Sequence, residues 1–380
     1  MKVALVAESF LPHTNGVTHS LLRVIDHLAV RGDDVLVIAP EGRRGEGPTH
    51  YGPARIARVP AVGWPGYRDV RVSVANKGLV AAHLDAFRPD VVHLASPFVL
   101  GWAGVRAAGD LGLPVVAVYQ TEVPSYAEQY GLGWGESFLW NRVRNIHTRA
   151  TITLAPSSAA IAQLEALGVG DVRRWARGVD SSRFHPSKRS PELRADWAPH
   201  GETVVGYVGR LAPEKRVGDL AALARIPGIS LVVVGDGPSA ARAREELPTA
   251  HFTGFLGGED LARAVASFDV FAHCGEFETF GQTLQEAFAS GVPVVAPRRG
   301  GPVDLVQDGV NGFLYAPGDL AEMGRHVRTI IRNPDTLAAF SRRARASVAH
   351  RTWTSVCDDL LEHYDDAILA ATPAASAVVA

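Results

Sequence analysis

The stretch Gly275–Gly301, GEFETFGQTLQEAFASGVPVVAPRRGG, predicts a loop, a helix, a strand and a second loop in that order. Helix-forming residues run from Gln282 to Ser290, and Gly291 follows them as the glycine that commonly ends a helix. The β-branched run Val292–Ala296 then predicts a strand. Strands that alternate with helices favour a parallel α/β sheet, in which ligands bind at the carboxyl ends of the strands.

Two glutamates flank the start of this helix, Glu278 in the loop before it and Glu286 in its second turn. A helix that opens at Gly281 points free backbone N–H groups at a ligand in front of it, and glycine lets that ligand approach closely. Those N–H groups belong to Gln282, Thr283 and Leu284. We therefore expect a phosphate at the helix start, with one carboxylate near a sugar and the other near a ribose. The alternative is an ordinary loop acid and a solvated helix residue, since glutamates at this spacing are common.

A second motif, Thr203–Lys215 with the sequence TVVGYVGRLAPEK, predicts a buried strand that runs into a loop containing Arg210 and Lys215. Two cations in such a loop suit a diphosphate, because both groups donate several hydrogen bonds to phosphate oxygens. The chain has 38 basic residues and only four of them are lysines, so a lysine at position 215 favours a specific role.

The composition is that of a globular protein. A length of 380 residues predicts two or three domains, and 47% hydrophobic residues with a net charge of −2 exclude a disordered or nucleic-acid-binding chain. The two cysteines, Cys274 and Cys357, form no CxxC or Cys/His cluster, which excludes a disulfide framework or a structural zinc site and suits a reducing cytoplasm.

No targeting or membrane-spanning segment is expected. The amino-terminal apolar run before Glu8 is too short for a signal peptide, and no run approaches the roughly 20 apolar residues of a spanning helix. We therefore expect a cytoplasmic protein whose membrane contact, if any, is peripheral.

The first half of the chain alternates strands and helices. Lys2–Ala7 predicts a buried strand, and Gly16 lies in the loop before the helix Val17–Arg31, but the loop is not GxGxxG, so a dinucleotide site loses its main support. Residues 62–74, VGWPGYRDVRVSV, have the proline and aromatic content of a surface loop. The proline-rich residues 181–202 predict a linker, after which a second strand–helix series begins at Thr203.

Three polar residues, His93, Gln120 and Glu122, follow strands of the first half. Parallel α/β sheets place ligands there, although a histidine at a strand end is often a structural residue. The helix expected over Phe138–Thr148 is basic and amphipathic, so it either lies against anionic lipid or packs its apolar stripe inward.

With both motifs in place, the chain resembles the retaining glycosyltransferases of GT-B architecture, in the large Glu-x7-Glu family known as glycosyltransferase family four. Within it, the chain is most similar to the actinobacterial GDP-mannose-dependent α-mannosyltransferases, whose members act on glycolipid acceptors. The resemblance covers nearly the whole chain and rests on the segments AESFLPHTNGVTHSLLRV, VVHLASP, VAVYQTEVPSYAEQYG, RWARGVD, VGRLAPEK, VVGDG, GEFETFGQTLQEAFASG and RRGGPVDLV.

The resemblance implies two Rossmann-like domains with parallel sheets that face a central cleft. Residues 1–180 would form the acceptor domain, completed by a carboxyl-terminal helix over about 353–372 that crosses back onto it. Residues 203–350 would form the nucleotide-sugar donor domain. No cofactor or metal is implied, and the donor half lacks a DxD pair after a strand, since Asp236 lies between two glycines.

The resemblance also implies roles for individual residues. Arg210 and Lys215 would hold the donor diphosphate, Glu278 would contact donor-sugar hydroxyls, and these three would be the catalytic residues. Further donor contacts would come from Gly16, Asp236, Gly237, Phe280, Gly281, Gln282, Thr283, Leu284 and, at the ribose, Glu286. His93, Gln120 and Glu122 would lie on the acceptor side.

Departures from the family pattern fall on the acceptor half. Many relatives carry histidine in place of Gln120, aspartate is usual in place of Glu122, and asparagine is expected in place of His19. The expected partners are GDP-mannose and a lipid or small hydroxyl acceptor, with no nucleic acid. Three alternatives remain: a UDP-sugar transferase with a soluble acceptor, a sugar-nucleotide epimerase or hydrolase of similar architecture, and a non-catalytic regulator that binds sugar nucleotides.

Overall fold

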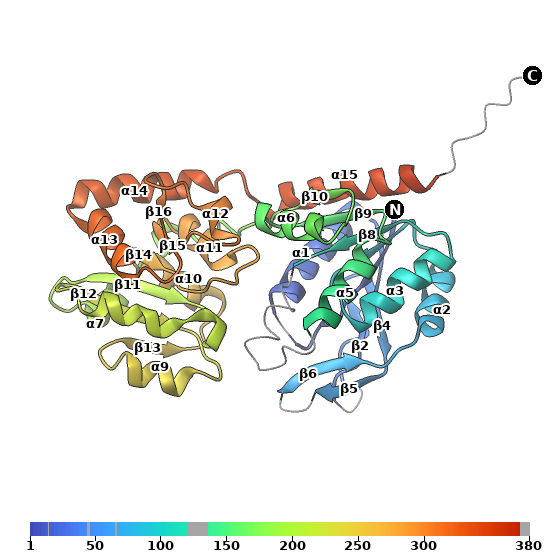
Figure 1. Cartoon of the computed structure of the whole chain (residues 1–380), viewed down its shortest axis with the longest axis horizontal. Helices are drawn as coiled ribbons and strands as arrows, with labels where there is room; N and C mark the ends of the chain where they lie inside the picture. Colours follow the sequence, from blue (N-terminus) through green and yellow to red (C-terminus); the bar gives the residue numbers. More distant parts are fainter. Residues whose placement is uncertain (14, 44–45, 65–66, 121–135, 373–380) are drawn as a thin grey trace, which may run out of the picture. The chain divides into compact units, whose positions relative to one another are not determined.

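The computed structural model describes residues 1–13, 15–43, 46–64, 67–120 and 136–372. They fall into two compact units (Figure 1), one formed by Met1–Ala176 with the chain from Val356 onward, and the other by Arg177–Ser355. Each unit is built on one mainly parallel sheet with helices packed against it, so the predicted α/β fold of two Rossmann-like domains is confirmed.

The first unit contains an eight-stranded sheet in the order β10-β9-β8-β7-β1-β2-β4-β3, parallel except where β3 joins β4. Its strands are β1 (Lys2–Val6), β2 (Asp34–Pro40), β3 (His50–Tyr51), β4 (Ala54–Val59), β7 (Val91–Leu94), β8 (Val115–Val118), β9 (Ile152–Ala155) and β10 (Val172–Arg174). Its described helices are α1 (Gly16–Arg31), α2 (Lys77–Phe87), α3 (Val99–Asp110), α5 (Glu136–His147), α6 (Ser158–Ala166) and most of α15 (Trp353–Ala371). The strand order reverses between β1 and β7, where α/β sheets bind ligands.

Local sequence accounts for these elements. Strand β1 is a continuous apolar run because Val3–Val6 are fully buried, as is usual for a parallel strand covered on both faces. Helix α1 begins at Asn15, whose side chain accepts a hydrogen bond from the Thr18 N–H at 2.9 Å. It ends at Gly32, where φ is 78°, a conformation that glycine adopts without strain.

The prediction of a surface loop over residues 62–74 is wrong. Strands β5 (Ala61–Trp64) and β6 (Tyr67–Ser73) form an antiparallel pair in which Val62 lies opposite Val72. Proline and aromatic content favoured a loop, whereas valines at alternate positions in the second part of the segment are a strand signal.

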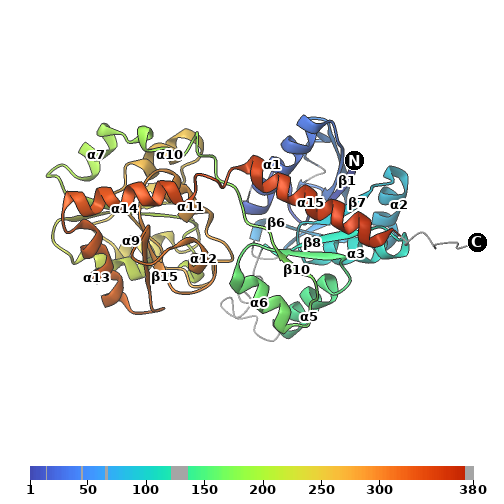
Figure 2. The same cartoon turned by 90° about the horizontal axis from the view of Figure 1, so that it is seen from above.

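Helix α15 packs on the first unit, beside α1 (Figure 2). The Trp175 Nε1–H donates to the Val356 carbonyl at 2.9 Å, and Tyr364 is fully buried. The apolar face of this helix therefore has the partner surface that an amphipathic helix requires.

The second unit contains a six-stranded, fully parallel sheet in the order β13-β12-β11-β14-β15-β16. Its strands are β11 (Thr203–Val208), β12 (Ile229–Val234), β13 (His251–Gly254), β14 (Val270–Ala272), β15 (Val294–Pro297) and β16 (Gly312–Tyr315). Its helices are α7 (Pro191–Trp197), α8 (Ala221–Ala224), α9 (Ala240–Glu246), α10 (Gly258–Ala266), α11 (Gln282–Ala289), α12 (Pro302–Leu305), α13 (Leu320–Ile331) and α14 (Pro334–Ser347), with 3-10 turns η3 (Pro186–Lys188), η4 (Pro213–Lys215) and η5 (Val217–Leu220). Here the strand order reverses between β11 and β14.

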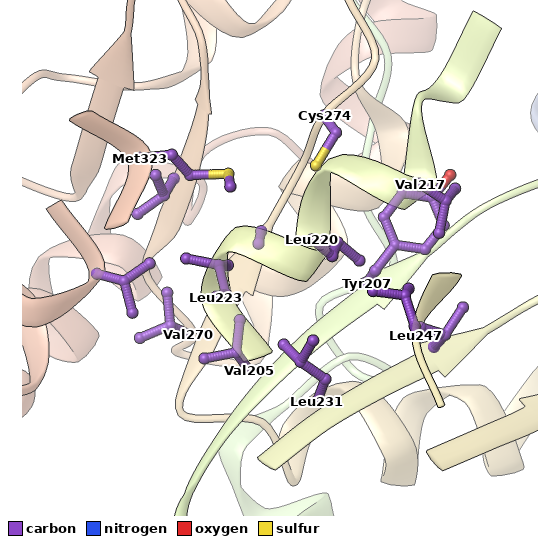
Figure 3. Packing of buried hydrophobic residues seen from close by; sticks show 14 of the residues in the cluster. Val205, Tyr207, Val217, Leu220, Leu223, Leu231, Leu247, Val270, Cys274 and Met323 are labelled. Atoms are coloured by element: carbon purple, nitrogen blue, oxygen red, sulfur yellow. The ribbon is translucent and has the colours of Figure 1, made fainter. Parts of the chain in front are cut away.

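The core of the second unit fills the space between this sheet and its helices (Figure 3). Val205 and Tyr207 from β11 lie in one cluster with Leu220 and Leu223 from the segment that follows η4. Met323 from α13 joins the same cluster. The loops that follow β11 and β14 are therefore attached to strands that are held in a closely packed core.

Residues 181–202, predicted as a linker, belong to the second unit. Arg194 forms an ion pair with Asp269 at 2.7 Å, and the α7 residue Trp197 is buried. Proline suggested an open segment, but Pro191 occupies the first turn of α7, where its missing N–H costs nothing. The first unit ends at Ala176, four residues before the predicted boundary at 180.

Candidate active site

The two predicted motifs of the second unit meet where its strand order reverses. Lys215 ends the turn η4 after β11, and Glu278 lies in the loop between β14 and α11. The Lys215 Nζ donates a hydrogen bond to Glu278 Oε2 at 2.8 Å, and the two side chains are only 16% and 21% exposed. An ammonium group and a carboxylate thus share one small region at the carboxyl edge of the sheet.

Glu278 also reaches the start of α11. Its Oε1 accepts a hydrogen bond from the Gly281 N–H at 3.1 Å. Burial by itself raises the pKa of Glu278, but the positive charge of Lys215 and the nearby His273 and Arg177 lower it to about 2. The carboxyl group is therefore ionised throughout the neutral range.

Helix α11 opens at Gly281, whose φ of 100° lies in the region that favours glycine. Of the three N–H groups predicted to face a phosphate, that of Leu284 instead donates to the Gly281 carbonyl at 3.0 Å. The Gln282 and Thr283 N–H groups have no acceptor among the residues that the structure describes. Two of the three predicted N–H groups therefore remain for a phosphate, because the i to i+3 hydrogen bond of the first turn uses the third.

The loop after β15 packs against the Glu278 loop through two glycines, Gly300 and Gly301. The Gly301 N–H donates to the Glu278 carbonyl at 2.6 Å, and a Cβ on Gly300 would lie 2.5 Å from the same oxygen. A side chain at position 300 would displace the loop that carries Glu278, so the sequence RRGG after β15 serves the geometry of this carboxylate.

The loop after β12 is held in a similar way. A Cβ on Gly237 would lie 2.4 Å from the Leu211 carbonyl, and the Leu211 N–H donates to the Asp236 carbonyl at 2.9 Å. These contacts place the predicted donor residues Asp236 and Gly237 beside the loop that contains Arg210.

Arg210 is exposed, and its guanidinium makes no ion pair with any residue of the described chain. Asp236 is also exposed, and its carboxylate accepts a hydrogen bond from the Gly237 N–H at 2.7 Å. Phe280, by contrast, is buried, so only its backbone is suited to contact a ligand.

Glu286 lies in α11 and is half-buried. Burial raises the pKa of Glu286 to about 7, while a hydrogen bond from Gln282 and the charge of Arg183 lower it. This carboxyl group therefore changes its charge near neutral pH, unlike Glu278.

The sequence predicted no role for Arg177 and His273, which act on the charge of Glu278, or for Gln285. The Gln285 Nε2 donates to the Arg177 carbonyl at 2.9 Å, and this contact joins the first residue of the second unit to α11. Burial lowers the pKa of His273 to about 4 despite the nearby Glu278, so its ring is neutral at pH 7. A histidine between a strand and a glycine offers no periodic signal that would have identified it.

The residues predicted on the acceptor side belong to the first unit. His93 is 1% exposed, and its Nδ1 lies 2.6 Å from the Tyr364 hydroxyl of α15. Burial lowers the pKa of His93 to about 3. In the structure His93 is therefore an internal contact of α15, and its expected place on the acceptor side stays a prediction.

Gln120 is also buried, and its Nε2 donates to the Ala95 carbonyl at 2.9 Å. Gly16 is the exposed first residue of α1. Glu122 lies outside the described residues.

Glu8, which sequence reasoning did not select, occupies the point where the strand order of the first sheet reverses. Its Oε1 accepts hydrogen bonds from the Leu100 N–H and, at 3.1 Å, from the Gly101 N–H at the start of α3. Burial raises the pKa of Glu8 to about 7, although these backbone hydrogen bonds oppose the shift. The carboxyl group joins the loop after β1 to the helix that follows β7.

Two further observations concern metals and membranes. Among the described residues, no three His, Cys, Asp or Glu side chains are grouped so that they could hold a metal ion. Within the same part of the chain, no helix is both long enough and apolar enough to span a membrane.

Comparison with family models divides the chain into the same two halves. Residues 14–183 match the model described as Glycosyltransferase Family 4, and residues 190–347 match the model described as Glycosyl transferases group 1.

Individual proteins agree with this division. The chain is 49% identical over 369 residues to the GDP-mannose-dependent alpha-mannosyltransferase of Mycolicibacterium smegmatis, covering 96% of this chain and 97% of the relative. It is 47% identical over 370 residues to the protein of the same name from Corynebacterium glutamicum, covering 97% and 89%. Among solved structures, Anabaena HepE in complex with UDP superposes with a TM-score of 0.78 at 22% identity, covering 96% of this chain and 100% of the other. The chain therefore belongs to the glycosyltransferases, with a family 4 amino-terminal half and a group 1 carboxyl-terminal half, and has the GT-B fold.

Proposed function

We propose that the protein transfers mannose from GDP-mannose to a hydroxyl group of a lipid acceptor and retains the α configuration in the new bond. The proposal rests chiefly on the Lys215–Glu278 pair in front of α11, in a chain about half identical to two proteins named as GDP-mannose-dependent alpha-mannosyltransferases.

The donor diphosphate would bind at the start of α11. The N–H groups of Gln282 and Thr283 and the Lys215 ammonium group supply donors there, and a helix amino terminus favours negative charge. The exposed Arg210 side chain adds a second cation with a long reach.

These cations also suit the reaction itself. The bond between mannose C1 and the diphosphate oxygen breaks, and the acceptor oxygen forms a new bond to C1 on the same face. The acceptor proton passes to the departing diphosphate oxygen, and GDP leaves. Negative charge grows on the diphosphate as its bond to C1 breaks, and donors already fixed in position stabilise that charge most in the transition state. No divalent metal is needed for this step, because Lys215, Arg210 and α11 supply the positive potential.

Glu278 and Glu286 would bind the hydroxyl groups of the donor. Glu278, ionised because of Lys215, accepts hydrogen bonds from hydroxyls of the transferred sugar, and Glu286 accepts them from the ribose. The first unit binds the acceptor, and the enzyme works at the cytoplasmic face of a membrane.

A donor-by-acceptor assay tests the proposal. Purified protein is incubated with GDP-mannose, UDP-glucose or UDP-galactose and a detergent-dispersed lipid extract, and labelled lipid products are counted. We expect labelled product from GDP-mannose that requires the extract. Equal or faster transfer from a UDP-sugar, or transfer only to water-soluble acceptors, contradicts the proposal. Release of free sugar without any acceptor identifies a hydrolase instead.

A further inference from the structure

Three arginines of the first unit converge on one tryptophan. The guanidinium carbons of Arg106, Arg142 and Arg149 lie 5.5, 4.9 and 5.1 Å from the centre of the Trp102 ring. Arg142 also lies 5.4 Å from the centre of the Phe138 ring. We call Trp102, Arg106, Phe138, Arg142 and Arg149 the Trp102 patch.

Helix periodicity explains why these side chains share one face. Trp102 and Arg106 are one turn apart on α3. Phe138 and Arg142 are likewise one turn apart on α5, and Arg149 follows seven residues later in the turn after this helix. Helices α3 and α5 pack against each other (Figure 1). The two stripes therefore form one continuous surface.

The positive charge of this surface is only weakly opposed by acids among the described residues. None of its three arginines forms an ion pair with a described residue. Burial lowers the pKa of Arg142, the carboxyl of Glu8 opposes this shift, and Arg106 adds to it by repulsion. Like charges held close together cost free energy, which an anionic partner would recover.

The patch is apolar as well as cationic. The Phe138 side chain is 63% exposed beside Arg142, and Trp102 is half-buried beneath the guanidinium groups. Aromatic side chains among arginines are typical of surfaces that lie at a lipid–water boundary, where rings enter the headgroup region and cations meet anionic headgroups. A second copy of the chain would bring the same charges together, so self-association through this surface is disfavoured.

We propose that the Trp102 patch docks the first unit on an anionic phospholipid surface. The choice of a membrane as the partner rests on the proposed function, because a lipid acceptor brings the enzyme to a membrane. The evidence for a binding surface is independent of that function and comes from the positions of the rings and guanidinium groups on α3 and α5. We expect Phe138 to lie among the headgroups, with Arg106 and Arg149 on the phosphates.

Vesicle sedimentation tests this without any substrate. The full chain is mixed with vesicles of phosphatidylcholine alone or of phosphatidylcholine with an equal part of phosphatidylglycerol, at low and high salt. We expect binding only to the anionic vesicles, weakened by salt. Arg106→Gln with Arg149→Gln should weaken that binding about 30-fold, because each arginine near an anionic surface contributes about fivefold.

A matched control separates the patch from net charge. Arg328 and Arg332 lie one turn apart in and just after α13, are exposed and form no ion pair with the described residues, so Arg328→Gln with Arg332→Gln removes the same charge elsewhere. The control should bind as the unaltered protein does, and thermal unfolding of both variants should match it. Equal loss in both pairs overturns the proposal.

Phe138→Ser distinguishes a membrane from a soluble polyanion. It should weaken vesicle binding while leaving binding to heparin unchanged. Heparin binding through the patch with no vesicle binding overturns the membrane assignment in favour of a soluble acidic partner. Mannosyl transfer in detergent without vesicle binding refutes the patch alone, whereas vesicle binding without transfer from any donor refutes the proposed function alone.

Discussion

Lys215 and Glu278 are 63 positions apart in the chain, yet the ammonium group of one lies 2.8 Å from the carboxylate of the other. The sheet topology explains this proximity. Strands β11 and β14 are neighbours although β12 and β13 come between them in sequence, so the loops after β11 and β14 meet at one edge. An ion pair in this position occupies the groups that a diphosphate and a sugar would use, and ligand binding must therefore rearrange it.

The first prediction concerns the affinity for GDP. Lys215→Ala should weaken GDP binding by about 1.5–3 kcal/mol, because it removes a charged hydrogen-bond donor from the proposed diphosphate site. Calorimetric titration measures the change. Lys188→Ala is the control, since Lys188 in the same unit pairs with Glu259 on the surface at 2.6 Å. Unchanged GDP affinity in Lys215→Ala would remove this lysine from the donor site.

The second prediction concerns Glu278. Glu278→Gln should lower kcat by roughly 10- to 100-fold, because an ionised acceptor for sugar hydroxyls becomes a neutral one. GDP affinity should not fall, since the amide no longer holds Lys215 by charge. Steady-state kinetics and GDP titration are compared in the same preparation. A loss of GDP affinity as large as that of Lys215→Ala would show that Glu278 serves the diphosphate instead.

The third prediction uses the charge of Glu286. Its pKa is raised to about 7, so the carboxyl group loses its negative charge as the pH falls below 7 and accepts ribose hydroxyls less well. GDP affinity should therefore decrease from pH 8 to pH 6, and the decrease should be smaller in Glu286→Gln. The terminal phosphate of GDP has a pKa of about 6 and titrates equally with both proteins, so the difference between them isolates the contribution of Glu286. Identical pH profiles for the two proteins contradict the ribose contact.

The fourth prediction concerns the contact between His93 and Tyr364. Tyr364→Phe removes the hydroxyl that lies 2.6 Å from the His93 Nδ1, while the other ring nitrogen already has no partner among the described residues. Leaving a buried polar group unsatisfied should cost about 1–3 kcal/mol of unfolding free energy in urea denaturation. The KM for the acceptor should not change. An increased acceptor KM with unchanged stability would return His93 to the acceptor site.

A fifth prediction concerns metals. Transfer should continue in excess EDTA, because Lys215, Arg210 and the start of α11 already provide positive potential at the diphosphate. Activity is measured with and without added Mg²⁺ or Mn²⁺. Complete loss in EDTA that either ion restores would contradict the metal-independent reaction.

Much of the donor half could be predicted because its signals are local. Gly281 before a helix-forming run marked the start of α11, and the strand runs before Arg210 and Glu278 placed both residues at the carboxyl edge of a sheet. The choice of Lys215 followed from the scarcity of lysine. Parallel-sheet topology then brings such residues together without any further information in the sequence.

The remaining features depend on packing between distant residues. Nothing near His93 in sequence indicates that Tyr364 will cover it. Glu8 likewise finds its partners at Leu100 and Gly101, more than ninety positions away. Proline content gave two predictions that differ from the structure. The predicted linker contains α7, because proline is also common in the first turn of a helix, and the predicted loop contains β5 and β6.

The stereochemistry of mannosyl transfer tests the central claim most directly. Purified protein is supplied with GDP-mannose and the lipid acceptor fraction, beside Lys215→Ala and Glu278→Gln, and the anomeric configuration of the new linkage is determined by NMR. We predict an α-linked mannosyl lipid from the unaltered protein and much less of it from both variants. A β-linked product, or no mannosyl product while a UDP-sugar is transferred, would contradict the account.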